Sequence, residues 1–253
     1  MIFNEMHIYS EALGMQTTVY VVMPQRSTGG EIGVDNNIKN EKYKCLYLLH
    51  GLTDDHTIWM RRTSIERYAG EHGICVVMPC GGRSFYTDMK YGEKYYTYIS
   101  QELPNIIQDN FNVSDKREDN YIAGLSMGGY GALKIGMKNC DRFSMAAGLS
   151  SVADIVEDSK RFHNVCVPIF GEDVIIPDSE NLMKIAEETD KNALKPRIFM
   201  GVGTEDSLYE GNIRLRDKFQ SLDYDFTYKE SSGTHNWAFW DEYIQYVFQW
   251  ITE

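Results

Sequence analysis

The sequence contains little of what marks several protein classes. Its 253 residues include only five cysteines and six prolines, and no Cys-x-x-Cys pair. An odd cysteine count without such pairs argues against a disulfide framework and against a thiolate zinc site. No apolar run comes near the roughly 18 residues of a membrane span. The opening residues include Glu5 and lack the apolar core of a signal peptide, so the sequence predicts a cytoplasmic protein.

Positive charge is also scarce. The chain has 25 Lys and Arg residues against 37 Asp and Glu, which leaves a formal net charge of −12 and a pI of about 5.0. Because Lys and Arg supply most of the affinity for phosphates, this balance argues against nucleic acids and anionic membranes as partners. It also favours neutral substrates over strongly anionic ones. With 43% hydrophobic and 25% charged residues, the composition is that of an ordinary globular protein.

Short apolar runs alternate with amphipathic stretches, which predicts an α/β fold with a mostly parallel central sheet and helices on both faces. Seven runs have the composition of strands, namely 17–23, 44–50, 74–79, 121–124, 143–149, 197–202 and 225–229. The first two runs and the opening segment are alternatively an antiparallel lead-in at one edge. The Gly- and Asn-rich stretch between Arg26 and Lys42 is predicted to be a hairpin loop between edge strands.

The length suits a single domain over residues 1–253. One long segment, at about 150–180, interrupts the alternation with two prolines and mixed periodicity. Segments of that length between core elements are usually functional, often as lids. We therefore predict a lid insertion there.

The strongest local motif lies where a strand-like run meets a helix-like run. The letters G-L-S-M-G at 124–128 form a G-x-S-x-G pattern, with Ser126 at its centre. In that context a strained turn exposes the serine hydroxyl, and side chains at Gly124 or Gly128 would crowd neighbouring elements. Taken by itself, the pattern is also compatible with a glycine-rich turn that contains an incidental serine.

The partners that a nucleophilic serine needs follow in the order Ser, acid, His that is typical of α/β-hydrolases. Asp206 comes after the run at 197–202, and His235 comes in the loop after the run at 225–229. A neutral imidazole takes the serine proton, and a carboxylate orients the imidazole. Glu205 competes with Asp206 for the acid role, and we favour Asp206 by its position. The remaining lone histidines are interpreted as surface or packing residues: His7, His56, His72 and His163.

Acyl transfer also needs backbone donors for a developing oxyanion. The residue after the nucleophile, Met127, supplies one N–H in the motif. The turn L-L-H-G-L-T follows the strand at 44–50, where Gly51 permits a sharp bend, and Leu52 is the predicted second donor. Alone, this turn would be an ordinary strand-to-helix connection.

Four segments together resemble the bacterial tributyrin-esterase type of the esterase D group, which also holds S-formylglutathione hydrolases, feruloyl and acetylxylan esterases and mycolyltransferases. They are residues 46–69, 124–134, 203–212 and 233–241. The resemblance implies an α/β-hydrolase fold that acts on short-chain acyl esters and uses no metal or organic cofactor. It also implies a triad and two oxyanion donors, namely Ser126, Asp206, His235, Leu52 and Met127.

We therefore predict a serine carboxylesterase whose partner is a small-molecule ester, with a homo-oligomer left open. A thioester hydrolase for S-formylglutathione and a feruloyl or acetylxylan esterase are the alternatives. An acyltransferase would use the same groups, and a binding protein on a hydrolase scaffold is the non-enzyme alternative. The turn departs from the H-G-G-G loop of larger lipases, which argues against long acyl chains.

Four aromatic residues lie in or beside the predicted active-site loops, namely Trp59, Phe170, Tyr209 and Trp237. Any of them can equally pack the core. From this group, Trp59 is predicted to contact substrate.

Overall fold

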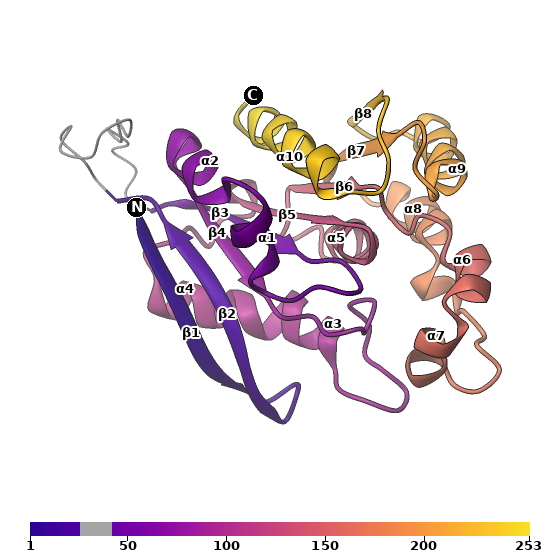
Figure 1. The fold of residues 1–253 in the computed structure, drawn as a ribbon, viewed down its shortest axis with the longest axis horizontal. Helices are drawn as coiled ribbons and strands as arrows, with labels where there is room; N and C mark the ends of the chain where they lie inside the picture. The colour runs from indigo at the N-terminus through magenta and orange to yellow at the C-terminus, as the bar shows by residue number, and fades with distance from the viewer. Residues whose placement is uncertain (26–41) are drawn as a thin grey trace.

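Eight strands of the described residues form one sheet in the order β1-β2-β4-β3-β5-β6-β7-β8 (Figure 1). The computed structural model describes residues 1–25 and 42–253. The strands are β1 Ile2–Ser10, β2 Met15–Met23, β3 Lys44–Leu49, β4 Ile74–Pro79, β5 Asn120–Leu125, β6 Met145–Leu149, β7 Arg197–Gly203 and β8 Phe226–Ser231. Strand β2 pairs antiparallel with β1 and β4, and every other pair is parallel. The predicted α/β fold with a mostly parallel sheet is confirmed, and each of the seven predicted runs is a strand.

The predicted hairpin between β2 and β3 is wrong. Its loop, residues 26–41, lies outside the described residues, but the strands that flank it do not pair. Strand β3 instead lies inside the sheet, between β4 and β5. Five of its six residues are buried, and such a run needs cover on both faces that no edge position offers. The antiparallel edge is formed by β1 and β2 alone.

Helices cover both faces of the sheet. The buried side chains of α1, α2 and α10 join one core cluster, and those of α4, α5, α8 and α9 join the other. The helices are α1 Ile58–Arg62, α2 Ile65–His72, α3 Tyr95–Thr97, α4 Leu103–Asn110, α5 Met127–Lys138, α6 Ile155–Arg161, α7 His163–Phe170, α8 Leu182–Asp190, α9 Tyr209–Gln220 and α10 Trp237–Thr252. A π-helical stretch at Tyr98–Glu102 joins α3 to α4, and short 3₁₀ turns lie at Arg117–Asp119 and Asp178–Glu180. In the part of the chain that is described, no helix has the length and apolarity to cross a bilayer.

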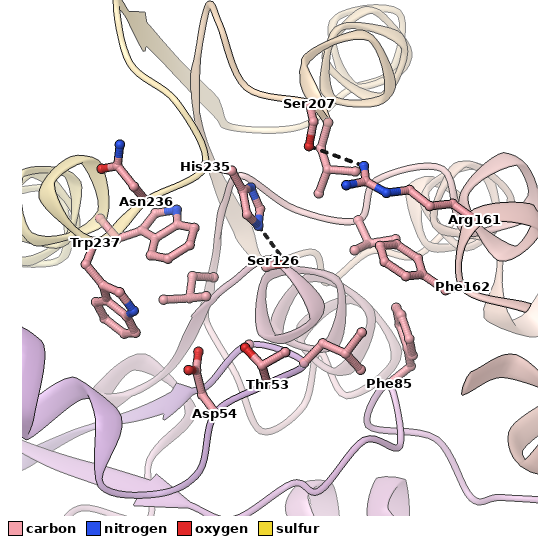
Figure 2. A pocket seen from close by; sticks show the side chains of 16 residues that line it. Thr53, Asp54, Phe85, Ser126, Arg161, Phe162, Ser207, His235, Asn236 and Trp237 are labelled. Atoms are coloured by element: carbon pink, nitrogen blue, oxygen red, sulfur yellow. Dashed lines mark hydrogen bonds between the residues drawn. The ribbon is translucent and has the colours of Figure 1, made fainter. Parts of the chain in front are cut away.

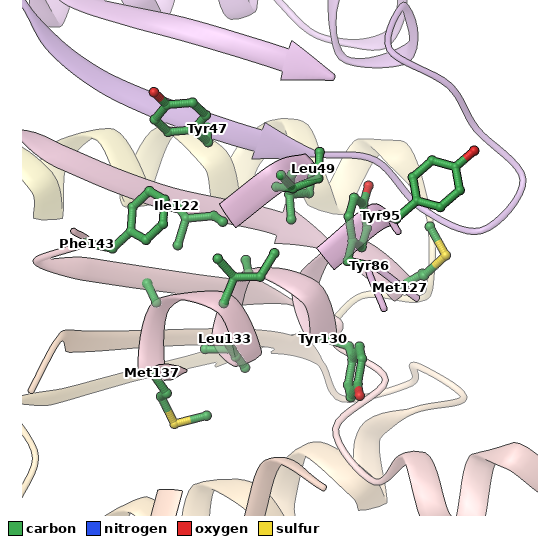
Figure 3. Packing of buried hydrophobic residues seen from close by; sticks show 14 of the residues in the cluster. Tyr47, Leu49, Tyr86, Tyr95, Ile122, Met127, Tyr130, Leu133, Met137 and Phe143 are labelled. Carbon is green, nitrogen blue, oxygen red and sulfur yellow. The ribbon is translucent and has the colours of Figure 1, made fainter. Parts of the chain in front are cut away.

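Helix α5 is the central helix of the larger core cluster. It packs against β5, β6 and α8. Figure 3 shows several of its side chains in the core cluster. Its side chains Tyr130, Leu133 and Met137 are buried, and Leu133 joins the cluster that contains Ile122 of β5. Because close packing leaves such a helix no room to shift, its first turn is held at a fixed place above the sheet edge.

The segment at about 150–180 contains two short helices, α6 and α7, and the turn Asp178–Glu180. Its end is tied to α5, because Lys134 Nζ lies 2.6 Å from Glu180 Oε2 and Tyr130 donates to the Glu180 carbonyl at 2.7 Å. The role of this segment as a lid stays a prediction. The description of the chain as a single domain that includes it also stays a prediction.

Candidate active site

Three predicted residues meet at the carboxyl ends of parallel strands. Ser126 follows β5, Asp206 follows β7 and His235 follows β8. Parallel strands end at one edge of a sheet, so the loops that follow them converge there. The His235 Nε2 atom lies 3.1 Å from Ser126 Oγ, and its Nδ1 atom lies 2.9 Å from Asp206 Oδ2 and 3.0 Å from Oδ1. These contacts join positions that are 109 and 29 residues apart in the sequence.

The turn at Ser126 is strained, as the motif predicts. Its φ of 54° and ψ of −118° lie in a region that residues with a Cβ rarely adopt. The Ser126 N–H donates to the Leu149 carbonyl at 2.8 Å, which ties the turn to β6. A Cβ on Gly124 would lie 2.3 Å from the Gly128 oxygen, and one on Gly128 would lie 2.5 Å from the Leu49 oxygen. Only glycines allow β5, α5 and the end of β3 to approach this closely.

Gly124→Ala is expected to lower the free energy of unfolding by about 3 kcal/mol, because the added methyl group meets backbone atoms that cannot move aside. Urea unfolding followed by circular dichroism measures the change. Gly211→Ala on α9 is the matched control, since its Cβ would have no neighbour nearer than 3.7 Å and alanine favours a helix. Equal stability of the two variants would contradict this account of the turn.

Asp206, not Glu205, faces His235. Asp206 is 5% exposed, and its Oδ1 atom also accepts the Leu208 N–H at 2.8 Å. Burial raises its pKa, but the hydrogen bond and positive charge of His235 and the Leu208 N–H outweigh burial, so the pKa lies below its ordinary value. Glu205 points outward and accepts the Gly233 N–H at 2.6 Å, which holds the loop that leads to His235.

The imidazole of His235 is held from a second side by an indole. The His235 and Trp240 rings meet edge to face with centroids 4.9 Å apart. The Trp240 Nε1–H donates to Ser150 Oγ at 3.1 Å, which fixes the indole against the end of β6. The ring of His235 therefore has little freedom to turn away from Ser126.

The two predicted oxyanion donors lie beside Ser126. Met127 is the first residue of α5, and Leu52 follows Gly51 at the end of β3. Within the described residues, neither N–H donates a hydrogen bond to the protein. The first N–H groups of a helix are free to bind an anion.

His50 holds the backbone next to Leu52. Its Nε2 accepts the Gly81 N–H at 2.8 Å, so its Nδ1 carries the proton and donates to the Gly51 carbonyl at 2.7 Å. Burial lowers the pKa of His50 to about 4, and the ring is neutral at pH 7. This histidine has a structural role that its position in the sequence did not reveal.

A pocket of about 430 Å³ opens above Ser126 (Figure 2). Its walls come from the loops after β3, β4, β5, β6, β7 and β8 and from helices α6 and α10. The lining residues are Gly51, Leu52, Thr53, Asp54, Phe85, Leu125, Ser126, Val152, Arg161, Phe162, Ser207, Leu208, His235, Asn236, Trp237 and Trp240. No group of three or more His, Cys, Asp or Glu side chains in residues 1–25 and 42–253 is arranged to hold a metal ion.

Trp59 does not line this pocket, which corrects the expectation that it contacts substrate. Its side chain is 1% exposed, its Nε1–H donates to the Leu49 carbonyl at 3.1 Å, and its ring packs edge to face under Trp237. Of the four aromatic residues considered from the sequence, only Trp237 reaches the pocket. A helix turn after β3 directs Trp59 into the core instead.

Sequence reasoning missed several residues of the opposite wall, including Phe85, Arg161 and Phe162. Phe85 has a φ of 49°, and its carbonyl accepts a hydrogen bond from the buried Lys134 at 3.2 Å. The Phe85 and Phe162 rings lie 6.0 Å apart. Neither residue belongs to a recognisable motif, so no local signal in the sequence marks them.

Comparisons with known proteins find relatives that match this chain over its full length. An acetyl esterase from Caldicellulosiruptor saccharolyticus is 29% identical over 265 residues, which cover 100% of this chain and 99% of the relative. A substrate-bound fluorophosphonate-binding serine hydrolase F of Staphylococcus aureus superposes with a TM-score of 0.87 at 29% identity, over 100% of this chain and 98% of that one. An S-formylglutathione hydrolase from Staphylococcus aureus superposes with a TM-score of 0.84 at 30% identity, over 100% and 99% of the two chains.

The family model described as "Putative esterase" matches residues 10–248, from the end of β1 to the last turns of α10. It therefore spans every strand that leads into the pocket. The chain belongs to the Esterase family and has the α/β-hydrolase fold.

Proposed function

We propose that the chain hydrolyses esters of short acyl groups through an acyl-enzyme, with Ser126 as nucleophile, His235 as general base and Asp206 as the group that orients His235. The 3.1 Å contact between His235 Nε2 and Ser126 Oγ carries the proposal. A serine hydroxyl is a weak nucleophile until a neighbouring base takes its proton. The contact of His235 Nδ1 with Asp206 places the imidazole proton on Nδ1 and leaves Nε2 free to accept.

The reaction proceeds in two displacements. Ser126 Oγ attacks the carbonyl carbon while its proton passes to His235 Nε2, and the N–H groups of Leu52 and Met127 bind the oxyanion. The carbon–oxygen bond to the leaving group breaks, and the leaving alcohol takes the proton from Nε2. Water then gives a proton to Nε2 and attacks the acyl carbon. The bond to Oγ breaks, and Ser126 regains its proton.

The pocket supports a short acyl group. Its volume of about 430 Å³ must hold both halves of the ester. The side chains of Phe85, Phe162 and Trp237 form walls that a long chain would have to displace. The names of two relatives, an acetyl esterase and an S-formylglutathione hydrolase, also refer to the two shortest acyl groups.

Thioester hydrolysis is the second candidate, because a structure 30% identical to this chain over its full length is an S-formylglutathione hydrolase. The same three residues would act on a thioester, and only the leaving group would differ. A feruloyl or acetylxylan ester is the remaining alternative.

One substrate panel tests these choices. We expect kcat/KM for p-nitrophenyl esters to fall by at least about tenfold between butanoyl and octanoyl, because extra methylene groups would collide with the walls formed by Phe85, Phe162 and Trp237. The panel also includes methyl ferulate, acetylated xylan and S-formylglutathione. A kcat/KM for the thioester far above that of every oxygen ester would replace the leading proposal with the second candidate.

A further inference from the structure

The side chains that line the pocket carry opposite charges at its two ends. Apart from His235, the charged side chains among its lining residues are Asp54 and Arg161. Figure 2 places them on opposite sides of Ser126, with Asp54 near Trp237 and Arg161 beside Phe162. A substrate that binds across Ser126 therefore meets a negative group at one end and a positive group at the other.

The Arg161 guanidinium has N–H donors that make no hydrogen bond within the described residues. It is the last residue of α6, and its Nη1 atom donates to the neutral Ser207 hydroxyl at 3.2 Å. No carboxylate in the described part of the chain lies within 4.0 Å of it. Nearby Arg214 differs, because its Nε and Nη2 atoms both bind Asp154. An arginine has five N–H donors in a planar fork that matches a carboxylate.

Asp54 makes the other end unfavourable for an anion. Its carboxyl is partly buried, and no Lys, Arg or His nitrogen of the described residues lies within 4.0 Å of it. A Cβ added at Gly51 would lie 3.0 Å from Asp54 Oδ2 and 3.8 Å from Ser126 Cβ, so the Asp54 carboxylate lies near the nucleophile. Burial raises the pKa of Asp54 above its ordinary value. An anionic substituent placed here would lie close to this carboxylate.

We propose that the pocket takes esters whose leaving group carries a carboxylate, and that Arg161 binds this carboxylate at the end away from Asp54. The inference rests on the proposed esterase function. If the acyl group is as short as acetyl, it has no room for a second charge, so the carboxylate belongs to the leaving group. The net charge of −12 acts over the whole surface, whereas a group bound at Arg161 responds mainly to the charges within a few ångströms. Arg161 is then a specificity-determining residue in the segment at 150–180.

The test compares two acetyl esters of equal shape, 3-acetoxybenzoate and 3-acetoxybenzamide. Their meta substituents cannot assist hydrolysis from within the molecule. The measured quantity is the kcat/KM of the benzoate divided by that of the benzamide. Differences in intrinsic reactivity cancel when this ratio is compared between the unmodified enzyme and its variants. Ester hydrolysis by Ser126→Ala is subtracted as background.

Arg161→Gln is expected to lower the ratio about tenfold, which corresponds to the loss of one hydrogen-bonded charge pair. Arg161→Lys keeps the positive charge but lacks the planar pair of N–H donors. Its ratio should therefore lie between that of Arg161→Gln and that of the unmodified enzyme. Asp54→Asn should raise the ratio about threefold by removing repulsion. In the unmodified enzyme, raising NaCl from about 0.1 to 0.5 M should reduce the preference, and in Arg161→Gln it should not.

Lys160→Gln is the matched control. Lys160 precedes Arg161 on α6, is 71% exposed, pairs with Glu157 at 2.6 Å and does not line the pocket. This variant removes the same charge from the same helix and should leave the ratio within about 1.5-fold. If Arg161→Gln shifts the ratio no more than Lys160→Gln, the assignment of Arg161 is wrong.

The experiment separates this inference from the proposed function. If the unmodified enzyme hydrolyses the neutral benzamide through Ser126 but Arg161→Gln leaves the ratio unchanged, only the inference about Arg161 fails. If neither ester is hydrolysed above the Ser126→Ala background, the proposed function fails and the inference fails with it. A salt-sensitive ratio that falls in Arg161→Gln but not in Lys160→Gln supports both.

Discussion

Ser126→Ala is expected to lower kcat/KM for p-nitrophenyl acetate by at least about 10⁴-fold. Alanine lacks the Oγ atom that lies 3.1 Å from His235 Nε2, so no acyl-enzyme can form. The backbone should not change, because Ser and Ala both place a Cβ in the strained turn at φ 54°. Release of p-nitrophenolate measures the activity, and the urea midpoint and circular dichroism measure the fold.

Ser207→Ala provides the comparison for Ser126→Ala. Ser207 is the other serine that lines the pocket, and its hydroxyl binds Arg161. A fluorophosphonate probe reacts with an activated serine, so labelling should disappear in Ser126→Ala and persist in Ser207→Ala. Near-normal turnover by Ser126→Ala with an unchanged spectrum would show that another group is the nucleophile.

Asp206→Asn is expected to lower kcat by about 10⁴-fold while the fold stays intact. An amide can donate to His235 Nδ1, which would move the imidazole proton to Nε2 and remove the acceptor that Ser126 needs. In the proposed mechanism, the buried Asp206 carboxylate also stabilises the imidazolium that forms during attack. Because its pKa lies below the ordinary value of 3.8, Asp206 stays ionised at neutral pH. A fall in activity well above pH 4 therefore belongs to another group.

Glu205→Gln separates the two neighbouring acids. The Glu205 carboxylate binds the Gly233 N–H and the Ser232 hydroxyl, and glutamine keeps an oxygen that can accept them. We expect kcat within about threefold of the unmodified enzyme, since the substituted group does not reach His235. The double variant Ser126→Ala with Asp206→Asn should lose no more than Ser126→Ala alone, because the residues act as one unit. A large loss of kcat in Glu205→Gln, with no such loss in Asp206→Asn, would assign the acid role to Glu205.

The part of the site that the sequence predicted consists of residues held in local motifs. Ser126 is surrounded by glycines that its turn requires, and the order Ser126, Asp206, His235 follows the order of the strands. The strands can be recognised in the sequence because a strand that is buried on both faces is an apolar run. A residue that directly follows a recognised strand can therefore be placed at the sheet edge before its neighbours are known.

The predictions for Trp59 and for the hairpin before β3 are wrong, because local patterns do not determine which segments become neighbours. Trp59 lies seven positions after Leu52, but sequence distance does not tell which way a helix turns its side chain. The buried run of β3 predicts a strand with cover on both faces, yet which strands lie beside it depends on the whole sheet. Both errors concern neighbours that are distant in the chain.

The sequence by itself determined the fold class, the turn at Ser126 and the position of His235 after the last strand, because each depends on a local pattern or on chain order. Only the tertiary structure decided that Asp206 and not Glu205 faces His235, that Trp237 and not Trp59 reaches the pocket, and that Asp54 and Arg161 lie at its two ends. These outcomes depend on side-chain directions and on contacts between segments that are far apart in the chain, such as those that carry Trp59 and Trp237. Such contacts form only when the whole sheet and the helices on its two faces have packed together.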